Sequence, residues 1–286
     1  MTQPHAKKST IVRAKAVRLL GALSWLAPAL AARLAAQLWF TIPPRVRVGT
    51  EAAGGAPFET RADGRVVRGA VWGDGPVVYL VHGWAGDRRQ MTPLVEPLVA
   101  AGHRVVAFDG PSHGRSDPGR SGPGRSHAVE FANALAAVAA VHGPGRAVVA
   151  HSMGAMATMV VLRLRRLSVE RLVFVAPMHE LRSYLDRFAD SLGLGRRARR
   201  RLDADLEARV GMLVEEFELV DLAKNAGSPP LLVVHDRDDR RLAWAESVAL
   251  VDQWPDARLL TTTGMGHNRP LGDRAVHDAI VRFVSP

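Results

Sequence analysis

The sequence predicts an α/β fold with a mostly parallel central sheet flanked by helices. Short, continuously apolar runs alternate with longer segments of helical periodicity, which is the pattern of parallel strands joined by crossover helices. The apolar runs show no alternation with polar residues, so we expect helices to cover both faces of the sheet. A length of 286 residues suits one large α/β domain or a domain with appendages.

The predicted strands follow in order along the chain. Residues 46–48 and 65–72 are predicted as antiparallel strands at the edge of the sheet. The next strand, residues 76–81 (PVVYLV), is apolar enough to be buried and is bounded by Gly75 and Gly83. Further buried strands are predicted at residues 103–108, 147–150, 172–175, 231–234 and 259–262.

Helical patterns separate these strands, as parallel pairing requires. The segment at 127–141 is rich in alanine, which favours a helix. The predicted helices cover residues 94–101, 127–141, 153–166, 242–253 and 274–283.

About 50 residues between the strands ending near 177 and starting at 231 contain no strand pattern. They predict two or three helices, with an inner side formed by Leu181, Leu185, Phe188, Leu192 and Leu194. An insertion of this size at the carboxyl end of a sheet is placed to cover a site, so we expect a helical cap at about 178–229. Its outer side carries an arginine cluster, which predicts either a solvated helix face or a surface that attracts an anionic substrate or lipid. The cluster consists of Arg196, Arg197, Arg199, Arg200 and Arg201.

Residues 1–45 form a basic and apolar segment, predicted helical, ahead of the domain at 46–286. Residues 19–32 are uncharged and follow five positive residues, and Ala29-Leu30-Ala31 has the form of a signal-peptidase site. One prediction is therefore a secreted protein cleaved near Ala31. The other is a cytoplasmic protein whose retained helix packs on the body or lies on an anionic membrane, with Arg13, Lys15 and Arg18 beside leucines. An uncharged run of 14 residues is too short to span a bilayer of about 30 Å.

The net positive charge of the chain is concentrated at its amino-terminal end. The chain has 38 basic and 28 acidic residues, a formal charge of +10, but eight of the basic residues precede the first acid, Glu51. The other 236 residues are nearly neutral, which argues against a nucleic-acid-binding fold. The chain has no cysteine, which excludes disulfides, thiol catalysis and cysteine-bound zinc. The histidines show no metal-ligand spacing and no phosphate-binding loop is present, so we expect neither a metal nor a cofactor.

The segment AVVAHSMGA, residues 147–155, predicts a nucleophilic serine. An apolar strand runs directly into a helix, and Ser152 stands on the turn between them with its hydroxyl exposed. Such a turn needs small residues two positions before and after the serine, here Ala150 and Gly154. The alternative is a serine that only caps the helix.

A second motif, Val81-His82-Gly83-Trp84, ends a buried strand about 70 residues earlier. A nucleophilic serine needs backbone N–H donors for the oxyanion, and we expect the amides of Trp84 and Met153 to supply them. His82, Gly83 and His151 are predicted on the substrate-binding side of the same site. The alternative for the motif is an ordinary glycine turn with a structural histidine.

The serine needs a base, which in turn needs an acid to orient it. The best candidate base is His267, in a glycine-containing loop after the last strand. The acid should follow the preceding strand, where Asp236, Asp238 and Asp239 compete. The order serine, aspartate, histidine differs from the orders in chymotrypsin and subtilisin.

Taken together, these motifs resemble those of the α/β-hydrolase superfamily, in its serine esterase and lipase-like group, from about residue 66 to 283. The residues that carry the resemblance are His82-Gly83-Trp84, the loop 109–116, His151-Ser152-Met153-Gly154, the run 236–239 and Gly266-His267. The family strand before the acid usually ends His-Gly-x-x-Asp, which implies Asp239 as the acid here. The sequence departs from the family at Ala150 and Asp236, where glycine is usual, and the second departure leaves Asp236 and Asp238 as alternatives.

The resemblance implies an α/β-hydrolase fold and hydrolysis of a small-molecule acyl substrate, with Ser152 as nucleophile, His267 as base and Asp239 as acid. A serine nucleophile disfavours family members that use aspartate, and the chain lacks the His-Gly-Gly-Gly run of the hormone-sensitive-lipase branch. A thioesterase, lactonase, C–C hydrolase or aminopeptidase would use the same triad. A non-catalytic protein that docks on a membrane or partner is the alternative from another class, and the oligomeric state stays open.

Overall fold

The computed structural model describes residues 19–43 and 49–285, and these form two units. The sheet unit comprises the described residues from 42 to 179 and from 218 to 285. The helical unit comprises residues 19–41 and 180–217. The helices beginning at residue 19 therefore belong to one unit with most of the insertion, whereas α8 (Leu219–Ala226), expected in the cap, belongs to the sheet unit.

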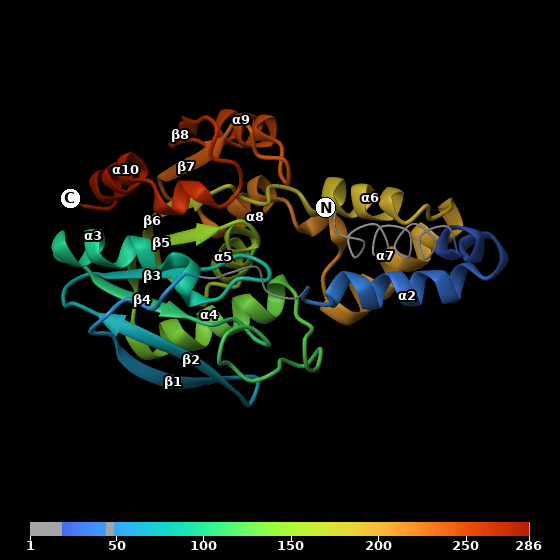
Figure 1. Ribbon diagram of the computed structural model, residues 1–286, viewed down its shortest axis with the longest axis horizontal. Coiled ribbons are helices and arrows are strands. Elements are labelled where there is room, and N and C mark those ends of the chain that lie inside the picture. Colours follow the sequence, from blue (N-terminus) through green and yellow to red (C-terminus); the bar gives the residue numbers. More distant parts are fainter. Residues whose placement is uncertain (1–18, 44–48, 286) are drawn as a thin grey trace, which may run out of the picture. The chain divides into compact units, whose positions relative to one another are not determined.

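The sheet unit is built on an eight-stranded sheet in the order β1-β2-β4-β3-β5-β6-β7-β8 (Figure 1). β1 pairs antiparallel with β2, and β2 with β4, while all the other pairs are parallel. The strands are β1 (Ala56–Ala62), β2 (Arg65–Trp72), β3 (Val77–Val81), β4 (Arg104–Phe108), β5 (Gly145–His151), β6 (Val169–Val175), β7 (Leu231–Asp236) and β8 (Ala257–Thr262). This confirms the predicted mostly parallel α/β sheet.

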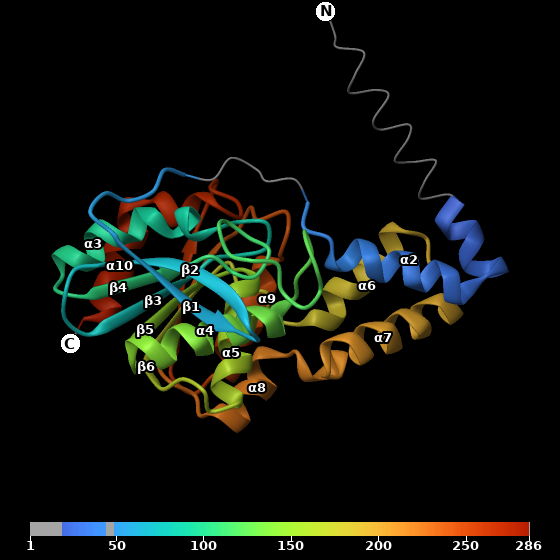
Figure 2. The same ribbon diagram turned by 90° about the horizontal axis from the view of Figure 1, so that it is seen from below.

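β3, β5 and β7 are buried along almost their whole length, because helices cover both faces of the sheet. Figure 2 shows α3 and α10 on one side and α4 and α5 on the other. The core on the first side joins strand residues such as Val78 and Val149 to Leu98 of α3 and Ile280 of α10. The helical segments of this unit are η1 (Arg88–Leu94), α3 (Val95–Ala100), α4 (Ala128–His142), α5 (Met153–Arg163), α8, α9 (Trp244–Gln253), η3 (Arg269–Gly272) and α10 (Arg274–Val284).

Two differences from the expected elements have simple causes. β1 was not expected, because its sequence APFETRA carries charges on its exposed face and lacks an apolar run. The helix expected at 94–101 begins at Val95, because the preceding turn, which contains Pro93, is a 3-10 helix. The strand expected at 46–48 and the basic residues Arg13, Lys15 and Arg18 lie outside the described residues.

The helical unit contains a helix at residues 19–26, α2 (Pro28–Phe40), α6 (Leu181–Ser191), α7 (Arg196–Val210) and the short η2 (Val214–Glu216). A row of small residues on α2, including Ala31 and Ala35, packs with Leu185 of α6 and Leu202 of α7. Ala31, the predicted cleavage position, thus lies in the core of this unit. No helix among the described residues is long and apolar enough to cross a membrane.

The register of the parallel strands brings their carboxyl ends to one edge of the sheet. Ala150 pairs with Val81 on one side and with Phe174 on the other, and Asp236 pairs with Thr262. The loops after β3, β5, β7 and β8 therefore begin at the same edge, which is where open α/β sheets place their ligands.

Candidate active site

Ser152 stands on a strained turn between β5 and α5. Its backbone has φ 54° and ψ −120°, a conformation that residues other than glycine rarely adopt and that costs of order 1–3 kcal/mol. Its amide donates to the carbonyl oxygen of Val175 at 3.0 Å, and its hydroxyl makes no capping hydrogen bond to α5. The turn thus has the geometry expected of a nucleophilic serine rather than of a helix cap.

Gly154 lets this turn pack against the end of β3. A Cβ atom at this position would lie 2.8 Å from the carbonyl oxygen of Val81 and 2.9 Å from that of His82. Both contacts are with backbone, which cannot move aside. Ala150, the departure from the usual glycine, is accommodated as a fully buried residue of β5.

His267 lies between Ser152 and Asp239. The Ser152 hydroxyl is 3.1 Å from Nε2 of His267, and Nδ1 of His267 is 2.7 Å from Oδ2 of Asp239. Of the two, Nδ1–H donates to the carboxylate and Nε2 accepts from the hydroxyl. The His267 ring is 8% exposed and the Asp239 carboxylate is fully buried. The structure brings these three predicted residues into one hydrogen-bonded series.

The other two candidate acids serve the loop that carries His267. The Asp236 carboxylate accepts hydrogen bonds from the Thr262 hydroxyl and from the amides of Asp238, Met265 and Gly266. Burial alone raises its pKa, but these donors outweigh burial and lower it. Asp238 is exposed and accepts from the amide of Gly264 at 2.7 Å. Neither carboxylate hydrogen-bonds to the His267 ring.

A second histidine contacts the Asp239 carboxylate. Nε2 of His235 is 3.2 Å from the same Oδ2, and its Nδ1 is 2.6 Å from the Ser247 hydroxyl. Burial raises the pKa of Asp239, but the hydrogen bonds from His235 and His267 lower it well below its ordinary value. The His235 contact was not expected from sequence, although His235 is the last residue but one of β7 and lies four residues before Asp239, near the strand end where the acid was sought.

The candidate oxyanion donors are the amides of Trp84 and Met153. Met153 is the first residue of α5, so its amide has no partner inside the helix. Around Trp84, the amide of Gly83 donates to Gln90 at 3.1 Å and the amide of Ala85 donates to His113 at 3.2 Å. In the described part of the chain, the Trp84 amide itself donates no hydrogen bond. Both amides are therefore available to a ligand.

His82 and His151, expected on the substrate-binding side, are instead buried framework residues. Nε2 of His82 accepts from the amide of Gly110 at 2.9 Å, and its Nδ1–H donates to the Gly83 carbonyl at 2.8 Å. Nε2–H of His151 donates to the carbonyl oxygen of His267 at 3.0 Å, which fixes the backbone of that residue. Burial lowers the pKa of His151 to about 3, so its ring is neutral at ordinary pH. Gly83 allows the close approach, because a Cβ there would lie 2.7 Å from Nδ1 of His151.

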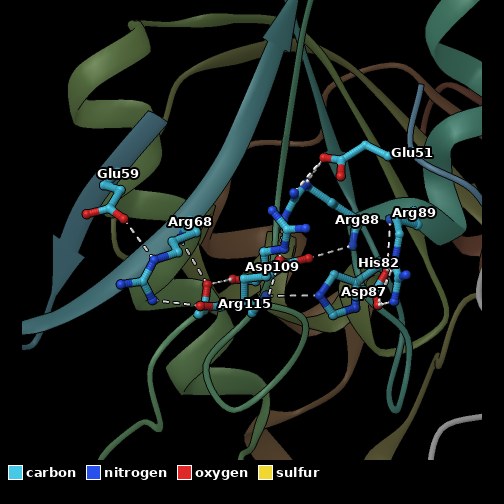
Figure 3. A network of polar contacts seen from close by, with 11 residues as sticks. Glu51, Glu59, Arg68, His82, Asp87, Arg88, Arg89, Asp109 and Arg115 are labelled. Atoms are coloured by element: carbon cyan, nitrogen blue, oxygen red, sulfur yellow. Dashed lines mark hydrogen bonds and ion pairs between the residues drawn. The ribbon is translucent and has the colours of Figure 1, made fainter. Parts of the chain in front are cut away.

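A buried ion pair fixes the loop that carries Trp84 (Figure 3). The Asp109 carboxylate pairs with the Arg88 guanidinium and accepts from the amides of Arg88 and Arg115, each at 2.9 Å. Glu51 pairs with the same guanidinium. Burial raises the pKa of Asp109 despite these donors. Asp109 therefore ties the loop after β4 to the loop after β3.

Two cavities border the loop 264–269. One, of about 780 Å³, is lined by His267 and Asp239 together with four arginines, Arg237, Arg240, Arg241 and Arg269. The other, of about 610 Å³, is lined by Trp84 and Met265 and shares Arg241 and Arg269. Among the described residues, none of these four arginines forms an ion pair, and no group of three or more histidines and carboxylates could hold a metal ion.

The sheet order, the serine turn and the buried histidine–aspartate pair define an α/β-hydrolase. A model of the alpha/beta hydrolase family matches residues 78–280, and the chain belongs to this family. No match is found among curated proteins.

Solved structures with the same fold include several esterases. The chain is 18% identical to Est1E from Butyrivibrio proteoclasticus, solved with bound ferulic acid, covering 79% of this chain and 96% of that one with a TM-score of 0.60. It is 20% identical to the Pyrococcus furiosus esterase PF2001, over 86% and 97% of the two chains, with a TM-score of 0.62. A bacterial membrane phospholipase A matches over 97% and 98% of the chains, at 14% identity and a TM-score of 0.62. At these identities the likeness establishes the fold.

Proposed function

We propose that the protein is a serine hydrolase that cleaves a carboxylic ester or a related acyl bond through an acyl-enzyme intermediate. The observation that supports this most directly is the continuous hydrogen-bonded series from the Ser152 hydroxyl through His267 to Asp239. A hydroxyl is a weak nucleophile at neutral pH, and a histidine oriented by a buried carboxylate is the base that activates it.

In the proposed reaction, Oγ of Ser152 attacks the acyl carbon while its proton passes to Nε2 of His267. Asp239 holds Nδ1–H and stabilises the imidazolium that forms. The carbonyl oxygen becomes an oxyanion and accepts hydrogen bonds from the amides of Trp84 and Met153. His267 then gives its proton to the leaving alcohol, the bond to the alcohol breaks, and the acyl group stays on Ser152.

Water then hydrolyses the acyl-enzyme, with His267 acting again first as base and then as acid. A water molecule gives a proton to Nε2 of His267 and attacks the acyl carbon of the acyl-enzyme. The tetrahedral species collapses, the carboxylic acid leaves, and the proton returns to Oγ of Ser152. Thioesters, lactones, activated C–C bonds and aminoacyl peptides would react through the same three residues, so a panel of these compounds separates the candidate substrates.

Replacement of the nucleophile tests the proposal. We expect Ser152→Ala to lower the hydrolysis of short p-nitrophenyl esters by at least about 10⁴-fold, because no other group can form the acyl-enzyme. Ser191→Ala is the matched control, since the exposed Ser191 hydroxyl bonds only to a helix carbonyl of the helical unit. Hydrolysis by Ser152→Ala at the rate of the wild type would overturn the proposal, and absence of any wild-type activity across the panel would favour a non-catalytic docking protein.

A further inference from the structure

The helical unit exposes an unusual number of large apolar side chains. Among the described residues, ten large hydrophobic side chains are exposed, and six of them lie within residues 19–38. They are Leu19 (71% exposed), Trp25 (80%), Leu26 (86%), Leu30 (49%), Leu34 (39%) and Leu38 (53%). Scattered single leucines are normal on a protein surface, but such a concentration marks an interaction site.

α2 exposes large apolar side chains along its whole length. Leu30, Leu34 and Leu38 are spaced four residues apart and therefore lie on one stripe of the helix. The opposite side of α2, represented by Ala32 and Ala36, is fully buried against α6 and α7. An ordinary surface helix has its apolar stripe inward and charges outward. α2 has small residues inward and leucines outward, so its exposed stripe needs a second apolar partner.

The charges around this stripe are of one sign. The exposed positions of α2 are Ala29, Leu30, Arg33, Leu34, Gln37 and Leu38, which include one arginine and no acid. Residues 1–18 of the sequence carry five basic residues, and the first acid of the chain is Glu51. A partner for this surface is therefore expected to be apolar and anionic.

α7 of the same unit adds four arginines. Arg196, Arg197, Arg200 and Arg201 are exposed, and within the described part of the chain none of them forms an ion pair. The remaining arginine of the cluster, Arg199, pairs with Asp190 of α6. Four unpaired guanidinium groups on one helix attract phosphate or carboxylate groups.

We propose that the exposed face of residues 19–38 docks on the surface of an anionic phospholipid bilayer. Leu30, Leu34 and Leu38 enter the boundary between headgroups and acyl chains, where Trp25 is also favoured, and Arg33 of the same helix contacts lipid headgroups. The α7 arginines add electrostatic attraction to the anionic surface at longer range. Because the other side of α2 is built into the core of the unit, the helix lies along the membrane surface. This inference rests on the helical unit alone and holds whether or not the proposed chemistry does.

Flotation of the full-length protein tests the surface. Vesicles of phosphatidylcholine mixed with phosphatidylserine should carry the protein at low salt, vesicles of phosphatidylcholine alone should carry much less, and added salt should weaken binding. The triple variant Leu30→Ser, Leu34→Ser, Leu38→Ser should bind at least about tenfold less, because three interfacial leucines are lost. These side chains are exposed, and the far-ultraviolet circular dichroism spectrum verifies that the variant is folded.

A matched control removes exposed apolar side chains from the other unit. Val141 and Leu164 are 59% and 49% exposed in the sheet unit, and the variant Val141→Ser, Leu164→Ser should bind as the wild type does. Replacing Arg196, Arg197, Arg200 and Arg201 by glutamine should reduce binding to the mixed vesicles and its salt dependence. Tryptophan emission should shift to shorter wavelength on binding, and Trp25→Phe should lose most of this shift.

Three results would overturn the proposal. The first is equal flotation of the leucine variant and the wild type. The second is a wild-type dimer in vesicle-free solution that the leucine variant dissolves into monomers, because the surface would then belong to a second copy. The third is stronger vesicle binding after deletion of residues 2–18, because that segment would then cover the stripe itself; the proposal expects weaker binding, since five basic residues are lost.

Discussion

Ser152 and His267 are held in place by different constraints. Ser152 is fixed by its backbone, which the strand-to-helix turn holds at a positive φ of 54°. His267 is fixed by hydrogen bonds, since Asp239 accepts from its ring and His151 donates to its carbonyl oxygen. The Asp236 carboxylate also accepts hydrogen bonds from the amides of Met265 and Gly266, the two residues before His267. A catalytic group held in this way loses little freedom at the transition state, which favours a rapid reaction.

Asp239→Asn tests the assignment of the acid at the residue scale. We expect kcat for ester hydrolysis to fall about 10³–10⁴-fold with little change in KM, because the amide orients His267 wrongly and cannot stabilise the imidazolium. Asp238→Asn should change kcat less than about tenfold, since Asp238 bonds only to the amide of Gly264. A large loss in Asp238→Asn with a small loss in Asp239→Asn would contradict the assignment.

The sequence placed Ser152 and His267 together because each follows a predicted strand, and parallel strands end at one edge. The choice among Asp236, Asp238 and Asp239 could not be made from the residues alone, because it depends on which carboxylate the turn after β7 directs toward the loop 264–269. The contact of His235 with Asp239 was missed for the same reason, since it arises across a tight turn whose geometry the sequence pattern does not specify.

At the scale of elements, the loops after β7 and β8 carry more than the acid and the base. They also supply the arginines that line the cavity of about 780 Å³ beside His267. In the proposed reaction His267 protonates the leaving group, and because His267 lines this cavity we expect the leaving group to face it. Arginines without carboxylate partners favour a leaving group that carries a negative charge.

Matched esters test this preference. We expect Arg241→Gln combined with Arg269→Gln to lower kcat/KM for the acetyl ester of 4-hydroxybenzoate about tenfold relative to the acetyl ester of methyl 4-hydroxybenzoate. The ratio of kcat/KM between variant and wild type is taken for each ester separately, so differences in the intrinsic reactivity of the two leaving groups cancel. Arg258→Gln, at the amino end of β8, removes one exposed charge away from the site and should leave the ratio unchanged. An equal effect of the double variant on both esters would contradict the preference.

The same scale shows what local patterns cannot predict. β3 (VVYLV) and the first four residues of β7 (LLVV) are continuous apolar runs, so the local pattern identifies them. The association of α2 with α6 and α7 joins segments about 150 residues apart, and no local signal encodes it. Alanines form the inward face of α2, because small residues allow the helices to approach closely.

At the scale of the whole molecule, the net positive charge is concentrated at the amino-terminal end of the chain. Eight basic residues precede residue 50, six of them before residue 42 and so outside the sheet unit, and the alpha/beta hydrolase family match covers residues 78–280. The chemistry proposed for Ser152 therefore needs none of the basic amino-terminal residues. In this account they determine where the protein acts.

The acid sensitivity of the whole fold should contain a component from His151. Its pKa is about 3 in the folded protein against 6.5 ordinarily, so the unfolded chain binds a proton between these values that the folded protein does not. The contribution of neutral His151 to stability is thus complete above pH 6.5 and is lost as the pH falls toward 3, by up to about 1.4 kcal/mol per pH unit. Urea unfolding of His151→Gln should show a correspondingly weaker pH dependence in this range, and identical slopes would contradict the assignment.

The central claim is that Ser152 is an activated nucleophile. Its most direct test is peptide mapping by mass spectrometry after treatment of the folded protein with a fluorophosphonate. The account predicts one phosphonylated residue, Ser152, with labelling slowed strongly in His267→Ala and abolished by unfolding the protein beforehand. Labelling at another serine, or an unmodified Ser152 in a protein that hydrolyses esters, would contradict it.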